Sequence, residues 1–89
     1  MPRKKGLDPK KYFSLCTGGL IKDVRELAFA LEYLSDEELD YHISEDNNDF
    51  SNWIRDVFKE YRLAARLSEI QDRKEMQITL LKHLVGKKR

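Results

Sequence analysis

The sequence predicts a mainly α-helical fold, a compact bundle of four to five short helices with a small N-terminal β-hairpin or extended element. Apolar residues recur at three- and four-residue intervals between residues 24 and 84, which is the period of helices that bury one face. Three stretches open with an Asp or Ser followed three residues later by Glu, the spacing of a helix capping box. With 89 residues, the chain has room for one domain.

The N-terminal part contains two short β-prone runs around a glycine turn. Residues 12–16 and 20–22 are the runs, and Thr17-Gly18-Gly19 is the turn between them. Glycine accepts the positive φ angles of tight turns, so a hairpin or two extended pieces are expected here. Two strands alone are marginally stable, and they therefore need a helical layer to pack on.

Capping residues set the expected starts of the first two helices. Asp23 with Glu26 opens a helix that continues to about residue 34 and buries one apolar face. Ser35 with Glu38 repeats the pattern and opens a second, short helix. In a capping box the first side chain accepts from an early helical N–H, and the second reaches back to the N–H of the cap residue.

A third helix is expected to start at Asn48 or Asp49, because the preceding loop is rich in residues that bond their own backbone. Phe50 and Trp53 begin an apolar stripe with helical spacing that continues to residue 58. We expect Trp53 at the centre of the core. His42, Asn48, Asp49, Phe50 and Trp53 are the residues to which the sequence assigns structural roles.

Two further helices complete the predicted bundle. After a break near residues 59–61, apolar residues predict a short fourth helix over residues 63–70. Asp72 with Glu75 caps a last helix, which is expected to end at Gly86. Its inward residues are expected to be Met76, Leu80, Leu81 and Leu84.

The net charge of +1 conceals a segregated distribution. Residues 1–25 and residues 55–89 each carry a net charge of +5, whereas residues 26–54 carry nine acids and no Lys or Arg. One interpretation is that the acids form a surface for a basic partner; the other is that they solvate the second helix and complement its N-terminal dipole. The acids assigned to the partner surface are Asp36, Glu37, Glu38, Asp40, Glu45 and Asp46.

The two basic ends suggest a division of the chain. Residues 1–11 are interpreted as a flexible basic arm, residues 12–85 as a single helical domain and residues 86–89 as a basic tail. Cationic ends neutralise phosphates with strong salt dependence, although they also serve solubility alone. Polyanion contact is expected at Arg3, Lys4, Lys5, Lys10, Lys11, Lys87, Lys88 and Arg89.

His42 is the strongest catalytic candidate, because several acids lie near it in the sequence and an imidazole titrates near neutral pH. The alternative is a partly buried His42 that hydrogen-bonds the loop over residues 47–49 and fixes the start of the next helix. A Cys–His pair with Cys16 is a third option, but the apolar residues around Cys16 predict a buried, inert thiol. No catalytic residue is assigned, and no enzymatic activity is expected.

The sequence indicates no cofactor, metal or small-molecule substrate. Two histidines forty-one residues apart and one cysteine match no zinc spacing. The acidic loop over residues 44–49 lacks the glycine and the terminal glutamate of a calcium loop, and phosphate-loop and dinucleotide motifs are absent.

No stretch approaches the roughly 20 apolar residues of a membrane span, and no secretion signal is recognisable. A cytoplasmic location without membrane partners is expected.

Two motifs resemble those of a small family of domains of unknown function found in archaea and some bacteria. They are the Tyr-His-Ile triplet at residues 41–43 and the Asn-Asp-Phe-x-x-Trp-Ile block at residues 48–54. An aromatic segment with a glycine turn (residues 12–19) and a Leu-Ser-Asp-Glu turn (residues 34–37) stand in a similar order, so the resemblance covers roughly residues 12–85. It implies a fold rather than an activity, and no catalytic residue is transferred with it.

These observations favour a non-catalytic helical interaction module over an enzyme. Its acidic face and basic tails are expected to contact macromolecular partners, with RNA, DNA or a ribonucleoprotein among them. Aromatic residues beside the basic arm are limited to Tyr12 and Phe13, so contact with the nucleic-acid backbone is expected rather than base-specific readout. The alternative is a protein–protein adaptor or a self-associating regulator that binds no nucleic acid.

Overall fold

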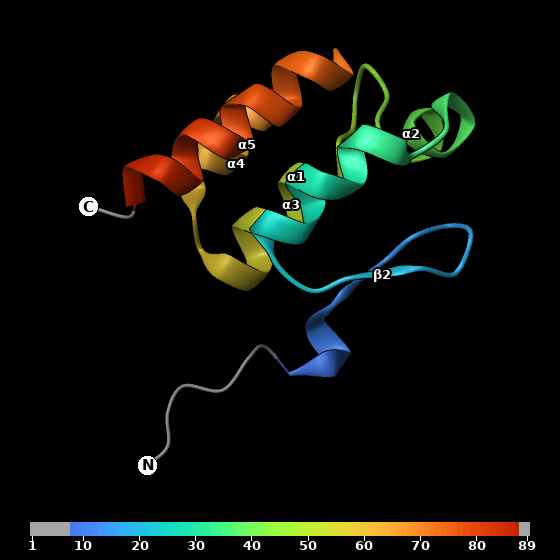
Figure 1. Ribbon diagram of the computed structural model, residues 1–89, viewed down its shortest axis with the longest axis horizontal. Helices are drawn as coiled ribbons and strands as arrows, with labels where there is room; N and C mark the ends of the chain where they lie inside the picture. The colour runs from blue at the N-terminus through green and yellow to red at the C-terminus, as the bar shows by residue number, and fades with distance from the viewer. Residues whose placement is uncertain (1–7, 88–89) are drawn as a thin grey trace.

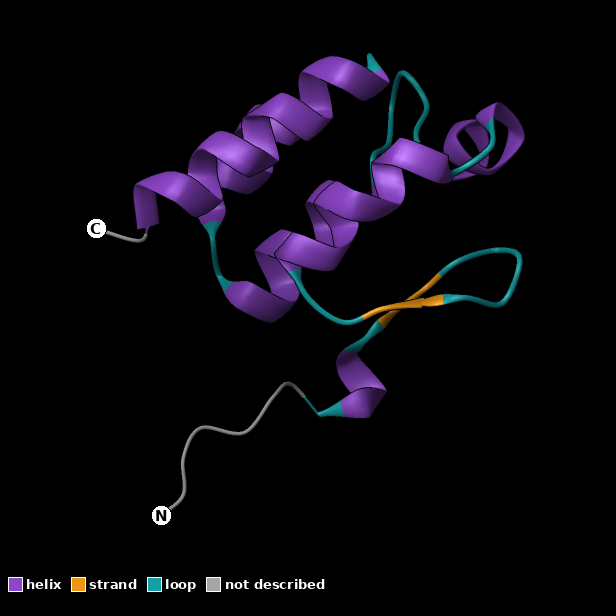
Figure 2. Cartoon of the chain, viewed as in Figure 1, coloured by secondary structure: helices purple, strands orange, loops and turns teal. Residues whose placement is uncertain are grey.

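The computed structural model describes residues 8–87 and confirms the predicted fold class (Figure 1). Helices make up most of this part of the chain, and a two-stranded antiparallel sheet lies on its N-terminal side (Figure 2). In chain order the elements are η1 (Pro9–Lys11), β1 (Phe13–Ser14), β2 (Leu20–Ile21), α1 (Val24–Tyr33), α2 (Asp36–His42), α3 (Asp49–Trp53), η2 (Ile54–Phe58), α4 (Tyr61–Ser68) and α5 (Arg73–Lys87).

β1 and β2 form a short hairpin that packs on the helices. Phe13 pairs with Ile21 in the antiparallel register, and both side chains are buried. Gly18 in the connecting loop has a φ of +103°, which L side chains rarely adopt, so the turn requires glycine at this position. The hairpin therefore has one apolar side against the core and one side toward solvent.

α1 and α5 lie side by side and run antiparallel (Figure 1). At the start of α5, Arg73 Nη1 donates to the Leu31 carbonyl near the end of α1, at 2.8 Å. One turn further along α5, Gln77 Nε2 donates to the Ala28 carbonyl at 2.9 Å and to Glu32 Oε1 at 3.0 Å. Because α5 meets earlier residues of α1 as it proceeds, these bonds fix the antiparallel arrangement.

The core lies among the helices, and the hairpin covers one side of it with Phe13 and Ile21. Phe50 and Ile54 are fully buried, whereas Trp53 belongs to the core but lies at its edge rather than at its centre. Its indole Nε1–H needs a polar partner and donates to the Lys11 carbonyl at 2.8 Å, so that end of the ring faces the N-terminal segment. The buried apolar residues are Phe13, Ile21, Val24, Leu27, Ala28, Ala30, Leu31, Leu34, Leu39, Ile43, Phe50, Trp53, Ile54, Leu63, Ala64, Leu67, Met76 and Leu80.

α5 differs from the prediction in two respects. Leu81, expected to point inward, is 42% exposed, whereas Met76 and Leu80 are fully buried. The helix also does not end at Gly86 but includes it and extends to Lys87. A surface helix buries only an arc of its circumference, and Leu81 lies beyond the edge of that arc.

The third predicted helix is α3 followed directly by η2, a π-helical turn. It ends at Lys59, whose φ of 58° places the residue in the left-handed region and redirects the chain. α4 then begins and ends two residues earlier than expected. Within the expected arm, residues 8–11 form a turn in which the Asp8 carboxylate accepts from the Lys10 N–H at 3.0 Å.

Candidate functional site

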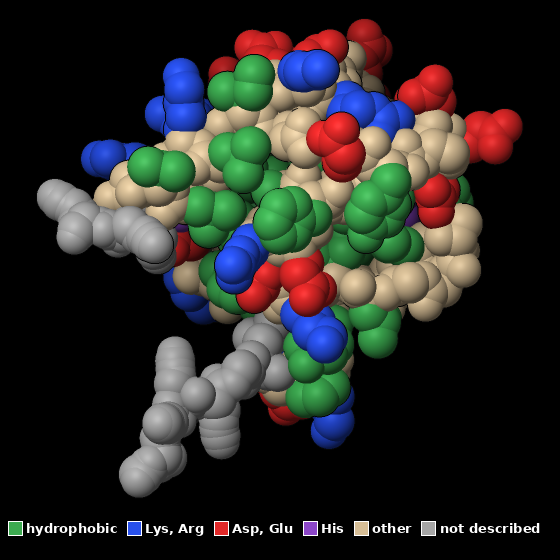
Figure 3. Space-filling view, in the orientation of Figure 1, with side chains coloured by type: hydrophobic (Ala, Val, Ile, Leu, Met, Phe, Trp, Pro, Cys, Tyr) green, Lys and Arg blue, Asp and Glu red, His purple; other side chains and the backbone are tan. Residues whose placement is uncertain are grey.

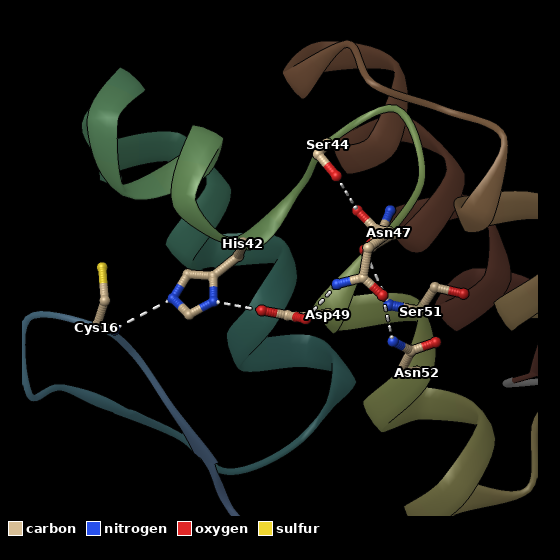
Figure 4. Close-up of polar contacts among 8 residues, drawn as sticks. Cys16, His42, Ser44, Asn47, Asp49, Ser51 and Asn52 are labelled. Carbon is tan, nitrogen blue, oxygen red and sulfur yellow. Dashed lines mark hydrogen bonds and ion pairs between the residues drawn. The ribbon is translucent and has the colours of Figure 1, made fainter.

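His42 joins three segments that are distant in the sequence (Figure 4). The side chain is 5% exposed at the end of α2. Its Nε2 accepts from the backbone N–H of Cys16 at 3.1 Å, and its Nδ1 lies 3.1 Å from Asp49 Oδ2. The ring also packs against Phe13 and Phe50, with centroids 5.0 and 5.5 Å away. His42 thereby connects the hairpin loop, α2 and the start of α3.

The two hydrogen-bond partners of His42 indicate which nitrogen of its ring carries the proton. An amide N–H can only donate, so Nε2 accepts from Cys16, and the proton on Nδ1 is donated to the carboxylate of Asp49. In this state both ring nitrogens are occupied within the protein, and neither is available to a substrate. The geometry is the one that the structural interpretation of His42 describes, and it offers no support for the catalytic interpretation.

The expectation of a buried Cys16 thiol is wrong, because Cys16 is exposed. Its contact with His42 is made by the backbone N–H, and the sulfur does not point toward the ring in Figure 4. Cys16 lies in the loop between β1 and β2, which follows the last paired residue of β1. The apolar neighbours in the sequence therefore do not carry the thiol into the core.

Two buried polar side chains connect α3 to the last turns of α4. Asn48 caps α3 by accepting from the Ser51 N–H at 3.0 Å, and its Nδ2 donates to the Leu67 carbonyl at 3.0 Å. Ser51 Oγ donates to the Ala64 carbonyl at 2.6 Å. Every polar atom of these two buried side chains that the structure describes thus has a partner inside the protein.

The hairpin loop is also held at the start of α2. Ser35 and Glu38 form both hydrogen bonds of the predicted capping box. The second carboxylate oxygen of Glu38 accepts from Thr17 Oγ1 at 2.5 Å. The hydrogen bond from Thr17, followed by that from the Ser35 backbone, holds the pKa of Glu38 below its ordinary value of 4.5. A carboxylate of this kind stabilises the folded state above its unfolded pKa, and this contribution is lost as the pH falls through its folded pKa.

Glu38→Gln is expected to flatten the acid limb of the stability profile. The wild-type free energy of unfolding should fall more than that of the variant below about pH 4.5, because only the wild type has a carboxylate with a lowered pKa at position 38 to protonate. Urea unfolding at several pH values measures this. Glu37→Gln is the control, because Glu37 is exposed and forms no ion pair with a residue in the range 8–87. Parallel acid limbs for the wild type and Glu38→Gln would contradict the prediction.

The predicted acidic surface lies on α2 and on the loop that follows it. Two of its six residues have partners in the protein: Asp36 Oδ1 accepts from Arg73 Nη2 at 2.9 Å, and Glu38 accepts from Thr17. The other four are exposed and form no ion pair with any residue that the structure describes; they are Glu37, Asp40, Glu45 and Asp46. The surface open to a partner is therefore smaller than the sequence suggests.

The predicted polyanion contacts lie mostly outside the described part of the chain. Lys10 and Lys11 are exposed in η1. Those that belong to residues 1–7 or to residues 88–89 are Arg3, Lys4, Lys5, Lys88 and Arg89. Lys87 ends α5, and its side chain is likewise outside the description.

The structure adds a basic groove between α4 and α5, which the charge pattern of the sequence does not reveal. It consists of two adjoining hollows that share Arg66 of α4 and His83 of α5. Arg62 of α4 lines the larger hollow, and Lys82 of α5 lines the smaller one. Its larger part has a volume of about 630 Å³ and is open to solvent. Arg62 and Arg66 are one helical turn apart, so the sequence alone indicates that they lie on the same side of α4. The α5 wall depends on how the two helices pack.

Acidic side chains limit the positive charge of the basic groove without neutralising it. Glu60 Oε1 lies 3.8 Å from His83 Nε2, and Glu69 also lines the groove. Arg62, Arg66 and Lys82 form no ion pair with another residue between positions 8 and 87. Three cations therefore remain available to an anion from solvent.

Between residues 8 and 87, no three His, Cys, Asp or Glu side chains gather in a way that could hold a metal ion. No helix in the same range combines the length and the apolarity needed to cross a membrane. Comparison of the chain with protein-family models, curated proteins and solved structures finds no match. The family resemblance of the two sequence motifs therefore stays a prediction.

Proposed function

We propose that the protein is a non-catalytic helical interaction module that binds a polyanion, RNA or DNA, through the basic groove and the basic ends of the chain. The observation that supports this is the presence of Arg62, Arg66 and Lys82 around two adjoining hollows, without an ion pair to a described residue. Guanidinium groups can bind phosphate oxygens in a bidentate manner, and they remain charged at all physiological pH values. A cytoplasmic location is part of the proposal.

The acidic surface would restrict the orientation of such a ligand. α2 is tied to the start of α5 by the bond between Asp36 and Arg73. Lys82 lies nine residues further on, which corresponds to about 14 Å along a helix. Phosphates near the basic groove would thus be kept from the α2 end of the molecule by repulsion from its exposed acids. The same acids remain the surface that we propose for a basic protein partner.

Replacing both groove arginines tests the proposal. Arg62→Gln with Arg66→Gln is expected to weaken binding of a labelled RNA hairpin about tenfold near 0.1 M salt, and to reduce the slope of log K against log salt by about 2. Fluorescence anisotropy measures both quantities, with a labelled DNA duplex as the second probe. A loss of two phosphate contacts is the physical reason.

The matched control removes the same charge elsewhere. Lys22→Gln with Arg55→Gln changes two exposed cations that do not line the basic groove, and it should leave most of the affinity and the salt slope intact. Equal losses in the two double variants would argue against the groove. Absence of wild-type binding at micromolar protein and about 50 mM salt would contradict polyanion binding and favour the alternative, an adaptor or self-associating regulator.

A further inference from the structure

An apolar face runs along α1 and α5. Figure 3 shows hydrophobic side chains gathered over these two helices on the side turned toward the viewer. The large hydrophobic residues that they expose are Phe29 (58% exposed), Tyr33 (73%), Ile78 (46%), Leu81 (42%) and Val85 (73%). An amphipathic helix normally presents polar residues on its solvent side. This apolar face is therefore the part of the described surface least suited to permanent contact with water.

The exposed apolar area of this face is similar to the apolar area that one partner buries in a typical dimer interface. With about 200 Å² for a large side chain, the exposed fractions of the five residues correspond to on the order of 500 Å². That value is at the upper end of what a soluble monomer exposes in one patch. A standard interface buries about 800 Å² per partner, of which somewhat more than half is apolar. The apolar face thus supplies what one side of such an interface requires.

α1 carries exposed charges of opposite sign before and after Phe29. Arg25, Phe29 and Glu32 have the spacing i, i+4 and i+7, which places them on one side of the helix. Arg25 and Glu32 are both exposed. Glu26 also precedes Phe29, but it is half-buried and accepts from the Lys22 N–H. The exposed charges of α1 are therefore positive before Phe29 and negative after it, so an identical face in the reverse direction is their electrostatic complement.

We infer that a second copy of this chain covers the apolar face in a two-fold symmetric dimer, with α1 of one copy packed antiparallel on α1 of the other. The two-fold axis passes near Phe29, and it brings Arg25 of each copy opposite Glu32 of its partner. Ile78 and Leu81 on α5 extend the apolar contact beside α1. In a symmetric interface each such contact occurs twice, which doubles the effect of each substitution.

A basic side chain at the centre of the face tests the dimer. Sedimentation velocity of the full chain over roughly 1–500 µM should show the mass rising toward twice the 10.6 kDa of one chain. Phe29→Lys places two like charges near the axis and should weaken the dimer at least about 100-fold, leaving monomer throughout this range. Tyr61→Lys is the control, since Tyr61 is 62% exposed on α4 and is not part of the apolar face; it should dimerise as the wild type does.

The outcomes separate folding from association. Circular dichroism of Phe29→Lys should match the wild type, because the replaced ring is mostly exposed. A wild-type chain that stays monomeric at the highest concentration overturns the inference. Equal behaviour of Phe29→Lys and Tyr61→Lys overturns the assignment to this face. Neither result bears on the basic groove, whose polyanion binding is measured separately.

A charge exchange tests the antiparallel arrangement. Arg25→Glu alone, or Glu32→Arg alone, sets like charges against each other twice and should weaken the dimer about tenfold. The two substitutions in one chain restore opposite charges at both places, so the affinity should return to within about threefold of the wild type. A double variant no better than the single variants would show that these residues do not face each other.

Discussion

Replacing Asn48 by aspartate is expected to destabilise the protein by about 3–5 kcal/mol near neutral pH. Asn48 is 5% exposed, and the oxygen and nitrogen of its side-chain amide form different hydrogen bonds. Oδ1 accepts from the Ser51 N–H, whereas Nδ2 donates to the Leu67 carbonyl. A carboxylate preserves the first contact but turns a second negative oxygen toward the Leu67 carbonyl. It also buries a negative charge at a site whose hydrogen-bond partners, among the described residues, are backbone groups and no cation.

The pH dependence distinguishes this mechanism from a simple loss of packing. Burial raises the pKa of the introduced carboxyl, so the penalty is complete above that raised pKa and shrinks as the pH falls toward the ordinary aspartate range near about 4. Once protonated, the carboxyl can donate to the Leu67 carbonyl as the amide does. Urea unfolding at about pH 7 and about pH 4.5 should therefore show a smaller difference from the wild type at the lower pH.

Asn48→Ser is the control for this prediction. Serine caps a helix about as well as asparagine, so this variant loses mainly the bond to Leu67. The Leu67 carbonyl still accepts from the Ile70 N–H at 3.0 Å, and the expected cost is about 1–2 kcal/mol at both pH values. An Asn48→Asp penalty that is independent of pH, or no larger than that of Asn48→Ser, would contradict the proposed repulsion.

The helix starts could be predicted from the sequence because capping is local. Ser35 and Glu38 are three residues apart, and both bonds between them form as expected. Asn48 caps α3, and Asp72 accepts from the Glu75 N–H at 2.8 Å at the start of α5. Asp23 also caps α1, but Glu26 reaches back to the N–H of Lys22 rather than to that of the cap. Such contacts depend on a few consecutive residues, and distant segments hardly alter them.

Burial was harder to predict because it depends on which elements meet. The helical period identifies Leu81 and Leu80 as apolar neighbours on α5 but does not say how wide an arc the neighbouring helices cover. Trp53 shares the stripe of Phe50, yet the N–H of its ring draws it to the edge of the core. Cys16 has apolar neighbours in the sequence, but its loop extends beyond the paired strands.

In the candidate sites too, the local contacts could be predicted from the sequence, whereas the contacts between distant segments could not. The closeness of His42 to the start of α3 could be inferred from a separation of seven residues, whereas its bond to the Cys16 backbone spans twenty-six residues and needs the folded hairpin. The basic groove likewise combines Arg62 and Arg66 with residues some twenty positions later. The periodicity of one helix does not indicate which neighbouring helix will line the other side of such a groove.

His42→Ala is expected to destabilise the protein by about 2–4 kcal/mol. The substitution removes a ring packed between Phe13 and Phe50. It also leaves the Cys16 N–H without its acceptor and Asp49 Oδ2 without its donor, whereas Asp49 Oδ1 still accepts from Asn47. Part of the loss is the cavity, and part is the loss of one of the two hydrogen bonds, Cys16–His42 and Thr17–Glu38, that join the hairpin loop to α2. Chemical denaturation gives the total, since a change in midpoint with an unchanged slope reports stability alone.

His42→Phe separates the two parts of this loss. A phenyl ring retains most of the packing against Phe13 and Phe50 but can neither accept from Cys16 nor donate to Asp49. If His42 holds the hairpin through hydrogen bonds, the Cys16 amide should lose its protection from hydrogen exchange in both variants, whereas amides in the core of α1 keep theirs. Nitrogen NMR of the wild-type ring should show the proton on Nδ1, because the amide that faces Nε2 can only donate. A Cys16 amide that stays protected in His42→Phe would mean that the hairpin is held without the hydrogen bonds of His42, by ring packing and the Thr17–Glu38 bond.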